Sequence, residues 1–346
     1  MELTIKKALL GVSVVAAAAL LASCSAAAPG GGGSNGDKPA DMPAEMTDIT
    51  VAVNPSAQMA PIYYGIESGI FEDHNLNVEI IGSSDVAAIV SGIASGQYDF
   101  GFATVVHSLN ANANGIQLRA VGVPDGQQAT EEDPETGNAL VAGPNSGIQD
   151  AGDLSGKTLG VIGLSSLNTL SAFKMAADAG VKDPANEIEL VQLPFGQMPQ
   201  ALASGEIDAA VIQSPFIGQA VATGSTIVGK PNVEIFGDAA VGLLNTTQSY
   251  IDQHPDVVEA FTQALIESQE AAKENIEAAQ DTLVDQLGIT PEEARASTWG
   301  MEKPPYVNTK GFEICQELLL EYVKDNPPGL ADLDVNTLVY KGALEP

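Results

Sequence analysis

Residues 94–104 read ASGQYDFGFAT and residues 203–213 read ASGEIDAAVIQ, so one short pattern occurs twice in the chain. Each copy contains a helix end, a glycine suited to a left-handed C-cap, an aspartate, and a run of small and apolar residues typical of a buried parallel strand. We therefore expect helix, glycine turn and buried strand at both places. Two similar lobes are our working interpretation, and two βαβ units of a single sheet are the alternative.

The two copies also indicate where a ligand would bind. Open parallel sheets bind ligands beyond the carboxyl ends of their strands, and Thr104 and Gln213 occupy these ends. Before the first copy, an apolar face at helical spacing predicts a helix that begins near Ser83, Ser84 or Asp85. Thr104 and Gln213 are thus candidate ligand contacts.

The rest of the chain alternates strands and helices until about residue 254. We expect strands at 49–53, 78–81, 118–123 and 139–142, a restart at 157–162, further strands at 188–191 and from 227, and a return crossing at 239–245. Helices follow, beginning at Pro255, at a capping box formed by Thr290 and Glu293, and near Phe312. This rhythm predicts α/β lobes. Lobe I comprises residues 47–145 and 238–346, and lobe II comprises residues 146–237.

The N-terminal residues resemble a targeting signal rather than a folded part of the protein. Lys6 and Lys7 precede an apolar run that ends in Leu21-Ala22-Ser23-Cys24, which resembles a bacterial lipobox. This predicts a lipoprotein signal peptide at 1–23, lipidation of Cys24, and a flexible glycine-rich tether at 24–46. The expected location is the outer face of a bacterial cell membrane. An ordinary secretory signal is the alternative.

Composition excludes several classes of function. The formal charge is -31, from 45 acidic against 14 basic residues, which opposes binding to nucleic acid or to anionic lipid. With Cys24 lipidated, Cys315 is the remaining cysteine, so we expect neither a disulfide nor a thiolate metal site. The stretch Gly163-Leu164-Ser165-Ser166-Leu167 lacks the spacing of a nucleophile elbow, and no glycine-rich run ends in Lys-Ser or Lys-Thr as a phosphate loop would. We predict no catalytic residue, no metal and no cofactor.

The polar residues at predicted strand ends are suited to binding instead. Serine clusters at 83–84 and 165–166 lie between a strand and a helix, where hydroxyl and backbone N–H groups can hold an anion, although helix capping is the alternative role. A neutral or cationic aromatic ligand, stacked on Phe195, Phe216 or Tyr63, is the other interpretation. The predicted ligand-binding residues are Asn54, Ser56, Ser83, Ser84, Thr104, Ser165, Ser166, Asn168, Gln213, Ser214 and Phe216.

Several segments together resemble a known family. APIYYGIESGIF at 60–71, LNVE at 76–79, LSGK at 154–157 and the two repeat copies are similar, in their order, to the substrate-binding proteins of nitrate, sulfonate, taurine and thiamine-precursor ABC importers. The resemblance implies a type II periplasmic-binding-protein fold, with two α/β lobes joined by two crossing segments and a cleft between them. Many members carry Trp-Glu-Pro-Phe where this chain has Gln213-Ser214-Pro215-Phe216, so a ligand preference that depends on that glutamate does not transfer.

The resemblance further implies a solute-binding protein that closes on a small polar ligand and delivers it to ABC permease subunits with a cytoplasmic ATPase. The expected ligand is a sulfonate-, nitrate- or taurine-like anion, and the alternative is a pyrimidine or another aromatic vitamin precursor. A distant relative is a pyrimidine-precursor synthase, but its cysteine-rich iron motif is absent from this sequence. An enzyme and a surface interaction protein are the competing classes.

Overall fold

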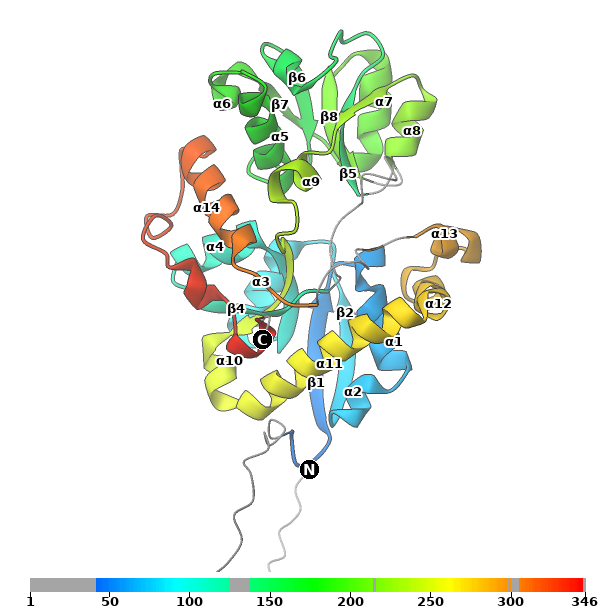
Figure 1. The fold of residues 1–346 in the computed structure, drawn as a ribbon, viewed down its shortest axis with the longest axis vertical. Helices are drawn as coiled ribbons and strands as arrows, with labels where there is room; N and C mark the ends of the chain where they lie inside the picture. The colour runs from blue at the N-terminus through cyan, green and yellow to red at the C-terminus, as the bar shows by residue number, and fades with distance from the viewer. Residues whose placement is uncertain (1–41, 125–136, 214–215, 298, 300–304, 345–346) are drawn as a thin grey trace, which may run out of the picture. The chain divides into compact units, whose positions relative to one another are not determined.

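The computed structural model describes residues 42–124, 137–213, 216–297, 299 and 305–344. Within these residues the chain forms two five-stranded sheets flanked by helices (Figure 1). The predicted signal peptide, Cys24 and most of the tether lie outside the described residues, as does Ser214. None of the helices in the described part of the chain combines the length and the apolar character that a membrane crossing requires.

The two sheets have the same topology. The first sheet runs, in spatial order, β2 (Leu76–Gly82), β1 (Thr47–Val53), β3 (Phe100–Thr104), β10 (Gly242–Thr247) and β4 (Leu118–Gly122). The second sheet runs β7 (Glu189–Gln192), β6 (Thr158–Val161), β8 (Ala209–Gln213), β5 (Asn138–Ala142) and β9 (Thr226–Gly229). In each sheet the fourth strand is antiparallel to both of its neighbours. The repeat copies therefore lie in separate sheets, and the single-sheet alternative is wrong.

One strand is in the other sheet than expected. The sequence placed residues 139–142 in lobe I, but β5 pairs with β8 and β9 of the second sheet. An apolar strand buried on both faces carries no signal for the sheet that it joins. The chain therefore passes from the first sheet to the second between β4 and β5, and it returns between β9 and β10. In each case the first strand after the passage is the antiparallel one.

The repeated pattern builds the same turn and the same polar clasp in both sheets. Gly96 and Gly205, at φ 74° and 76°, are the left-handed C-caps of α3 (Val86–Ser95) and α7 (Met198–Ser204). The Asp99 carboxylate then accepts from the backbone N–H and the hydroxyl of Thr50, at 2.8 and 2.9 Å. The Asp208 carboxylate accepts from the same two groups of Thr158, both at 2.9 Å. Each aspartate thus joins its turn to the neighbouring parallel strand, at the middle of β1 and at the start of β6.

Helices cover both faces of the first sheet. On one face α3 buries Ile89 and Ile93 against Ala52 and Ala103. On the other face lie α1 (Ala60–Glu67) and α11 (Pro255–Glu274), and the ring of Phe261 stacks on Phe100 with centroids 3.9 Å apart. The remaining helices associated with this sheet are α2 (Ile70–Asp73), α4 (Val105–Ala113), α10 (Gln248–Gln253), α12 (Ile276–Leu287), α13 (Pro291–Ala296) and α14 (Lys310–Tyr322).

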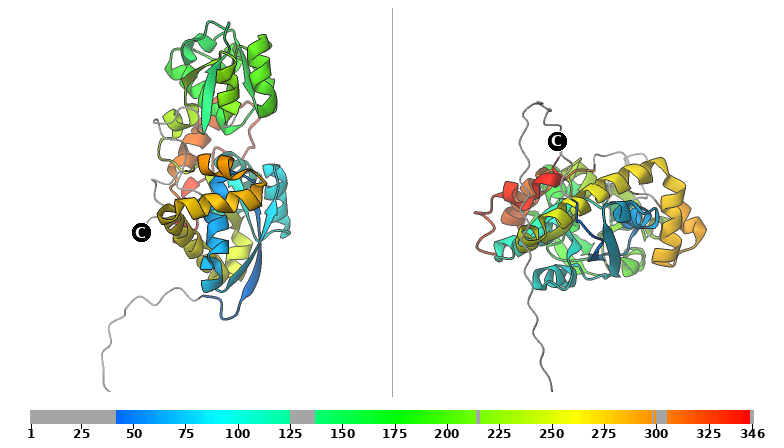
Figure 2. Two further views of the ribbon diagram at one scale, coloured as in Figure 1. Left: turned by 90° about the vertical axis from the view of Figure 1, so that its right-hand side faces the viewer. Right: turned by 90° about the horizontal axis from the view of Figure 1, so that it is seen from below.

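The second sheet is covered by α5 (Leu167–Asp178), α6 (Pro184–Glu187), α7, α8 (Phe216–Ala222) and α9 (Pro231–Phe236) (Figure 2). The C-terminal helix α14 packs on α4 and also on α5, where the rings of Tyr322 and Phe173 meet edge to face. Short 3-10 turns complete the fold: η1 (Ala57–Met59), η2 (Ala151–Leu154), η3 (Phe195–Gln197), η4 (Val335–Leu338) and η5 (Lys341–Ala343).

Several local predictions are confirmed. Thr290 and Glu293 form a capping box at the start of α13, and α11 begins at Pro255. Cys315 is fully buried as a free thiol, and burial raises its pKa above the ordinary range. The thiol therefore stays protonated and contributes to the core rather than to chemistry.

Candidate functional site

At the first sheet, the predicted polar residues gather at the carboxyl ends of three adjacent strands. β1 and β2 are in register to Val53 and Gly82, and the N–H of Ser83 donates to the Val53 carbonyl at 2.9 Å. β3 pairs with β1 on the other side and ends at Thr104. Asn54, Ser83 and Thr104 are therefore at one edge. Ser56 lies in the loop after β1, and Ser84 lies in the loop after β2.

The hydroxyls at this edge are not used as helix caps. Ser56 precedes η1 without a side-chain capping bond, and the N-cap of α3 is Asp85, whose carboxylate accepts from the Ala88 N–H at 3.1 Å. The Ser83 hydroxyl accepts a hydrogen bond from the Asp85 N–H at 3.3 Å, and Ser84 is exposed. The capping role that the sequence left open therefore falls to Asp85.

Thr104 has a partner that sequence reasoning missed. Its hydroxyl is 2.8 Å from Nδ1 of His107, in the first turn of α4. Burial lowers the pKa of His107, and the nearby Asp85 carboxylate opposes this shift only in part. His107 is consequently neutral at pH 7 and keeps one ring nitrogen as donor and one as acceptor. The spacing of three residues from Thr104, one helical turn, was the available signal.

At the second sheet, the matching edge carries the loop between β6 and α5. Ser166 is the N-cap of α5, and its hydroxyl accepts from the Thr169 N–H at 3.3 Å, so the capping interpretation is correct for this residue. Ser165, just before it, is half-buried. Gln213 ends β8 as an exposed residue opposite Asn138.

Asn168 has a different role from the one expected. Its amide donates to Oδ1 of Asn138 at 3.2 Å and accepts from Nδ2 of Asn232 at 2.9 Å. Asn232 accepts in turn from the Ser171 hydroxyl at 2.6 Å. Because Asn168 is only 8% exposed, these protein partners occupy its side chain. The residue fixes α5 to β5 and α9, and this opposes a direct ligand contact.

The aromatic candidates fall into two groups. Tyr63 is 4% exposed inside the core beneath the first sheet, where burial raises its pKa to about 12, so it cannot stack on a ligand. Phe195 and Phe216 are only half-buried and begin η3, which follows β7, and α8, which follows β8. A Cβ placed on Gly196 would lie 3.5 Å from the Phe216 ring, so η3 and the start of α8 lie close together.

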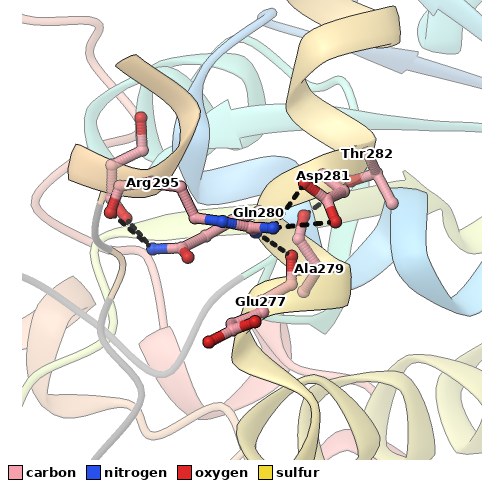
Figure 3. A network of polar contacts seen from close by, with 7 residues as sticks. Glu277, Ala279, Gln280, Asp281, Thr282 and Arg295 are labelled. Carbon is pink, nitrogen blue, oxygen red and sulfur yellow. Dashed lines mark hydrogen bonds and ion pairs between the residues drawn. The ribbon is translucent and has the colours of Figure 1, made fainter. Parts of the chain in front are cut away.

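Both arginines serve the framework. Arg119, at the amino end of β4, donates to Oδ1 of Asn112 at 3.1 Å and to the Leu118 carbonyl at 2.8 Å. Arg295 fastens α13 to α12 through the Asp281 carboxylate, at 2.9 Å, and the Glu277 carbonyl (Figure 3). Gln280 adds bonds to the carbonyls of Arg295 and Ser297, both at 3.0 Å. The contacts of both guanidinium groups therefore lie away from the carboxyl edges of the two sheets.

A separate cavity lies at the opposite edge of the first sheet. Its volume is about 590 Å³, and its lining includes Asp99 just before β3, Gln117 just before β4, and Tyr250 and Gln253 of α10. Burial and the neighbouring Asp99 carboxylate raise the pKa of Tyr250 well above its ordinary value. Sequence analysis did not anticipate this cavity, which is a second place where a small polar molecule fits.

The described residues offer little for catalysis. They contain no group of three or more His, Cys, Asp or Glu side chains able to hold a metal ion. The buried thiol of Cys315 is protonated, and the side-chain partner of His107 is the Thr104 hydroxyl at a strand end. The polar groups at the strand ends are instead hydrogen-bond donors and acceptors suited to holding a ligand.

Comparisons with known proteins show what this chain is similar to. The sequence model of the family described as NMT1/THI5 like matches residues 56–279. A 4-amino-5-hydroxymethyl-2-methylpyrimidine phosphate synthase of Candida albicans is 32% identical over 104 residues, 30% of this chain and 28% of that protein. The matched region therefore spans well under two thirds of that relative.

Solved structures resemble nearly the whole fold. The periplasmic aliphatic sulphonate binding protein of Escherichia coli is 15% identical, with a TM-score of 0.65 over 84% of this chain and 98% of that one. The ligand binding component of an ABC-type import system from Staphylococcus aureus is 16% identical, with a TM-score of 0.64 over 86% and 96%. The chain thus has the fold of periplasmic binding proteins, and the predicted fold class is confirmed.

Proposed function

Because the chain belongs to the NMT1/THI5-like family, we propose that it is the extracytoplasmic solute-binding protein of an ABC importer. In this proposal the carboxyl edges of the two sheets face each other across a cleft, and lobes built on the two sheets close on a small ligand. Closure is driven by the ligand's higher affinity for the closed form. The closed protein then delivers the ligand to permease subunits powered by a cytoplasmic ATPase.

The observation that carries the proposal is the pairing of equivalent edges. β1, β2 and β3 correspond to β6, β7 and β8 by strand order, and polar side chains follow strands at both sets of carboxyl ends. In open α/β sheets these ends are where ligands bind. Thr104 and Gln213 end the two equivalent strands β3 and β8.

The ligand's polar group is held without arginine. Hydroxyls of Ser56, Ser83 and Thr104, together with Ser165 and the backbone N–H groups at the start of α5, supply neutral donors. Three or four hydrogen bonds to a charged group, at roughly 1.5 to 3 kcal/mol each, reach the ~8 kcal/mol that micromolar affinity requires. A sulfonate-, nitrate- or taurine-like anion therefore fits. The solved sulphonate-binding protein of the same fold supports this class.

A pyrimidine or another aromatic vitamin precursor is the second candidate. The half-buried rings of Phe195 and Phe216, and the partial match to a pyrimidine phosphate synthase, favour it. Synthase activity itself finds no support in the candidate site, because the cysteine-rich iron motif is absent from the sequence. Binding without turnover is the expected behaviour with either ligand.

Membrane attachment completes the proposal. The lipobox-like stretch before Cys24 supports lipid anchoring at the outer face of the cell membrane, and the glycine-rich residues that follow would act as the tether. Mass spectrometry of the protein purified from a bacterial membrane tests this part. A diacylglyceryl mass on Cys24 supports the anchor, and an unmodified Cys24 contradicts it.

The site is tested by paired substitutions at the two edges. A thermal-shift screen with sulfonates, nitrate and pyrimidines first identifies a ligand, and calorimetry then measures its affinity. Thr104→Ala combined with Gln213→Ala should weaken binding about tenfold or more with little change in thermal stability, because both side chains lie at strand exits. The matched control is Ser249→Ala with Gln253→Ala in the separate cavity. Unchanged affinity in the first variant and a loss in the control would move the site to the cavity.

A further inference from the structure

The separate cavity beside β3, β4 and α10 carries charge of one sign. Among the described residues that line it, Asp99 is the one charged side chain, and none is lysine, arginine or histidine. Neutral hydroxyl and amide groups add hydrogen-bonding capacity, namely those of Ser95, Gln117, Thr246, Thr247, Ser249 and Gln253. Arg119 is not part of the lining, and its guanidinium donates to Asn112 and to the Leu118 carbonyl. A cavity of this composition favours a cation over an anion.

The Asp99 carboxylate is able to accept a further hydrogen bond. Its two bonds from Thr50, at 2.8 and 2.9 Å, both go to Oδ2, and a carboxylate has about four acceptor sites on its two oxygens. The ion pairs found among the described residues do not include Asp99. Its negative charge is thus held by neutral donors of the protein. An ammonium group in the cavity would form the charge-assisted hydrogen bond that the carboxylate lacks.

Two half-buried tyrosines line the cavity beside this carboxylate. The Tyr98 ring packs directly on α3, where a Cβ placed on Gly92 would clash with it. The Tyr250 ring meets the Phe100 ring edge to face, with centroids 5.4 Å apart. Packing therefore fixes both rings, and each keeps part of its surface accessible. Aromatic faces attract cations that lie within about 6 Å of the ring centroid.

The equivalent end of the second sheet is filled by the chain itself. β5 corresponds to β10 by strand order, and directly after β5 the Gly143 N–H donates to the Asp208 carbonyl at 2.8 Å. A Cβ on Gly143 would lie 3.1 Å from the Leu202 carbonyl oxygen and 3.2 Å from that of Asp208. Ile207, at the position of Tyr98, is 1% exposed. The cavity is therefore not a by-product of the repeated pattern, although both aspartates form the same clasp.

We propose that the separate cavity binds a small organic amine in its ammonium form, with the nitrogen at the Asp99 carboxylate and the carbon atoms against the rings of Tyr98 and Tyr250. The volume of about 590 Å³ lies within the range of roughly 300 to 1,000 Å³ that is typical of small-molecule sites. The exposed amides of Gln117 and Gln253 accept from a second donor of the ligand. The site adds a second ligand to the one at the carboxyl edges and does not depend on the proposed function.

The test is calorimetry of the purified full chain with 1,4-diaminobutane and 1,4-butanediol, two four-carbon chains that differ in the charge of their end groups. Measurements in about 0.15 M salt screen long-range attraction to the acidic chain. The diamine should saturate one site per chain and bind about tenfold or more tightly than the diol. Equal affinity of the two compounds, or no saturable binding of the diamine, would overturn the inference.

A matched pair of substitutions separates the cavity from the clasp. Asp99→Asn removes the charge and keeps an amide oxygen as acceptor for Thr50, and it should weaken diamine binding about tenfold or more. Asp208→Asn makes the same change in the clasp of the second sheet and should leave the affinity unchanged. An equal loss in both variants, or unchanged binding in Asp99→Asn, would contradict the site.

A second pair of variants places the new charge on an exposed side chain, where folding is not at risk. Gln253→Lys adds a positive charge to the cavity lining and should also weaken diamine binding about tenfold or more. Gln286→Lys, the same change at an exposed position of α12, should alter the affinity less than about twofold. Similar losses in both would assign binding to the net charge of the chain and overturn the inference. Sulfonate affinity at the carboxyl edges should stay unchanged in Gln253→Lys, so failure of amine binding leaves the proposed function standing.

Discussion

The first sheet, β2-β1-β3-β10-β4, and the second, β7-β6-β8-β5-β9, can be compared strand by strand. They agree where a helix turns into the third strand: Gly96 matches Gly205, and the Asp99–Thr50 clasp matches the Asp208–Thr158 clasp within 0.1 Å, at 2.8 and 2.9 Å against 2.9 Å. They differ at the carboxyl edges, where the loops after β1 and β2 begin with polar residues and the equivalent loops after β6 and β7 begin with apolar ones. The comparison teaches that the framework of each sheet requires fixed residues, whereas the edge is free to be specialised for a ligand.

The largest expected effect comes from breaking the clasps. Asp208→Ala removes a carboxylate that accepts two hydrogen bonds from Thr158, and should lower the free energy of unfolding by about 2 to 4 kcal/mol in urea denaturation. Asp99→Ala should cost a similar amount if the two sheets are equivalent. Glu206→Ala, an exposed acid in the same turn as Asp208, is the control and should change stability by less than about 0.5 kcal/mol. A cost at one clasp only would break the comparison.

The next effect concerns the second sheet alone. Asn168→Ala leaves the amides of Asn138 and Asn232 without their partner and should cost about 2 kcal/mol, because buried donors and acceptors lose their hydrogen bonds. Combined with Asn232→Ala, the two losses should fall short of additivity in a double-mutant cycle. Additive losses would show that the amide chain is not a unit. Ser165→Ala in the preceding loop should be nearly neutral for stability.

A smaller, matched pair of effects is expected at the glycine caps. Gly96 and Gly205 have left-handed backbones, and a Cβ at either position would meet nothing within 4 Å. Alanine should therefore cost only backbone strain, about 1 kcal/mol at each site. Asparagine should cost less, and Asn75, at φ 58°, shows that this chain already accommodates it in such a conformation. Costs that differ by more than about 1 kcal/mol between the two glycines would argue against equivalent turns.

The smallest expected effect tests the first edge through pH. A lowered pKa means that the folded protein resists protonation of His107, while the unfolded chain protonates it at the ordinary value. Its contribution to stability is therefore fully present above about pH 6.5 and declines as the pH falls below that value. His107→Gln should reduce the difference in unfolding free energy between about pH 7.5 and about pH 5.5. Parallel pH profiles of the unfolding free energy for variant and wild type would show that His107 does not resist protonation at this edge.

Much of the framework could be predicted from the sequence. The glycine, aspartate and apolar run of each repeat copy carry local signals, namely a left-handed cap and a buried strand, and both appear as expected. The sheet of β5 could not be predicted, because pairing partners of a fully buried strand are set by long-range contacts. The passage between the sheets therefore lies before β5 and not after it.

The candidate site was less predictable than the fold. Positions at strand ends follow from the sequence periodicity, so the locations of Thr104 and Gln213 could be predicted. The partners of side chains could not. Asn168 has the polar side chain expected of a ligand contact, but its amide is hydrogen-bonded to Asn138 and Asn232, which are distant in sequence. Tyr63 is buried in the core. The cavity at the amino end of β3 also depends on segments far apart in the chain.

The central claim is that one ligand binds at the carboxyl edges of both sheets. Hydrogen–deuterium exchange of the protein, with and without the sulfonate that gives the largest thermal shift, tests this most directly. The account predicts slower exchange on binding in peptides that contain residues 83–85 and 104–107 of the first sheet's edge and residues 162–166 and 193–197 of the second's. Protection confined to residues 93–99 and 246–253, around the separate cavity, would contradict it.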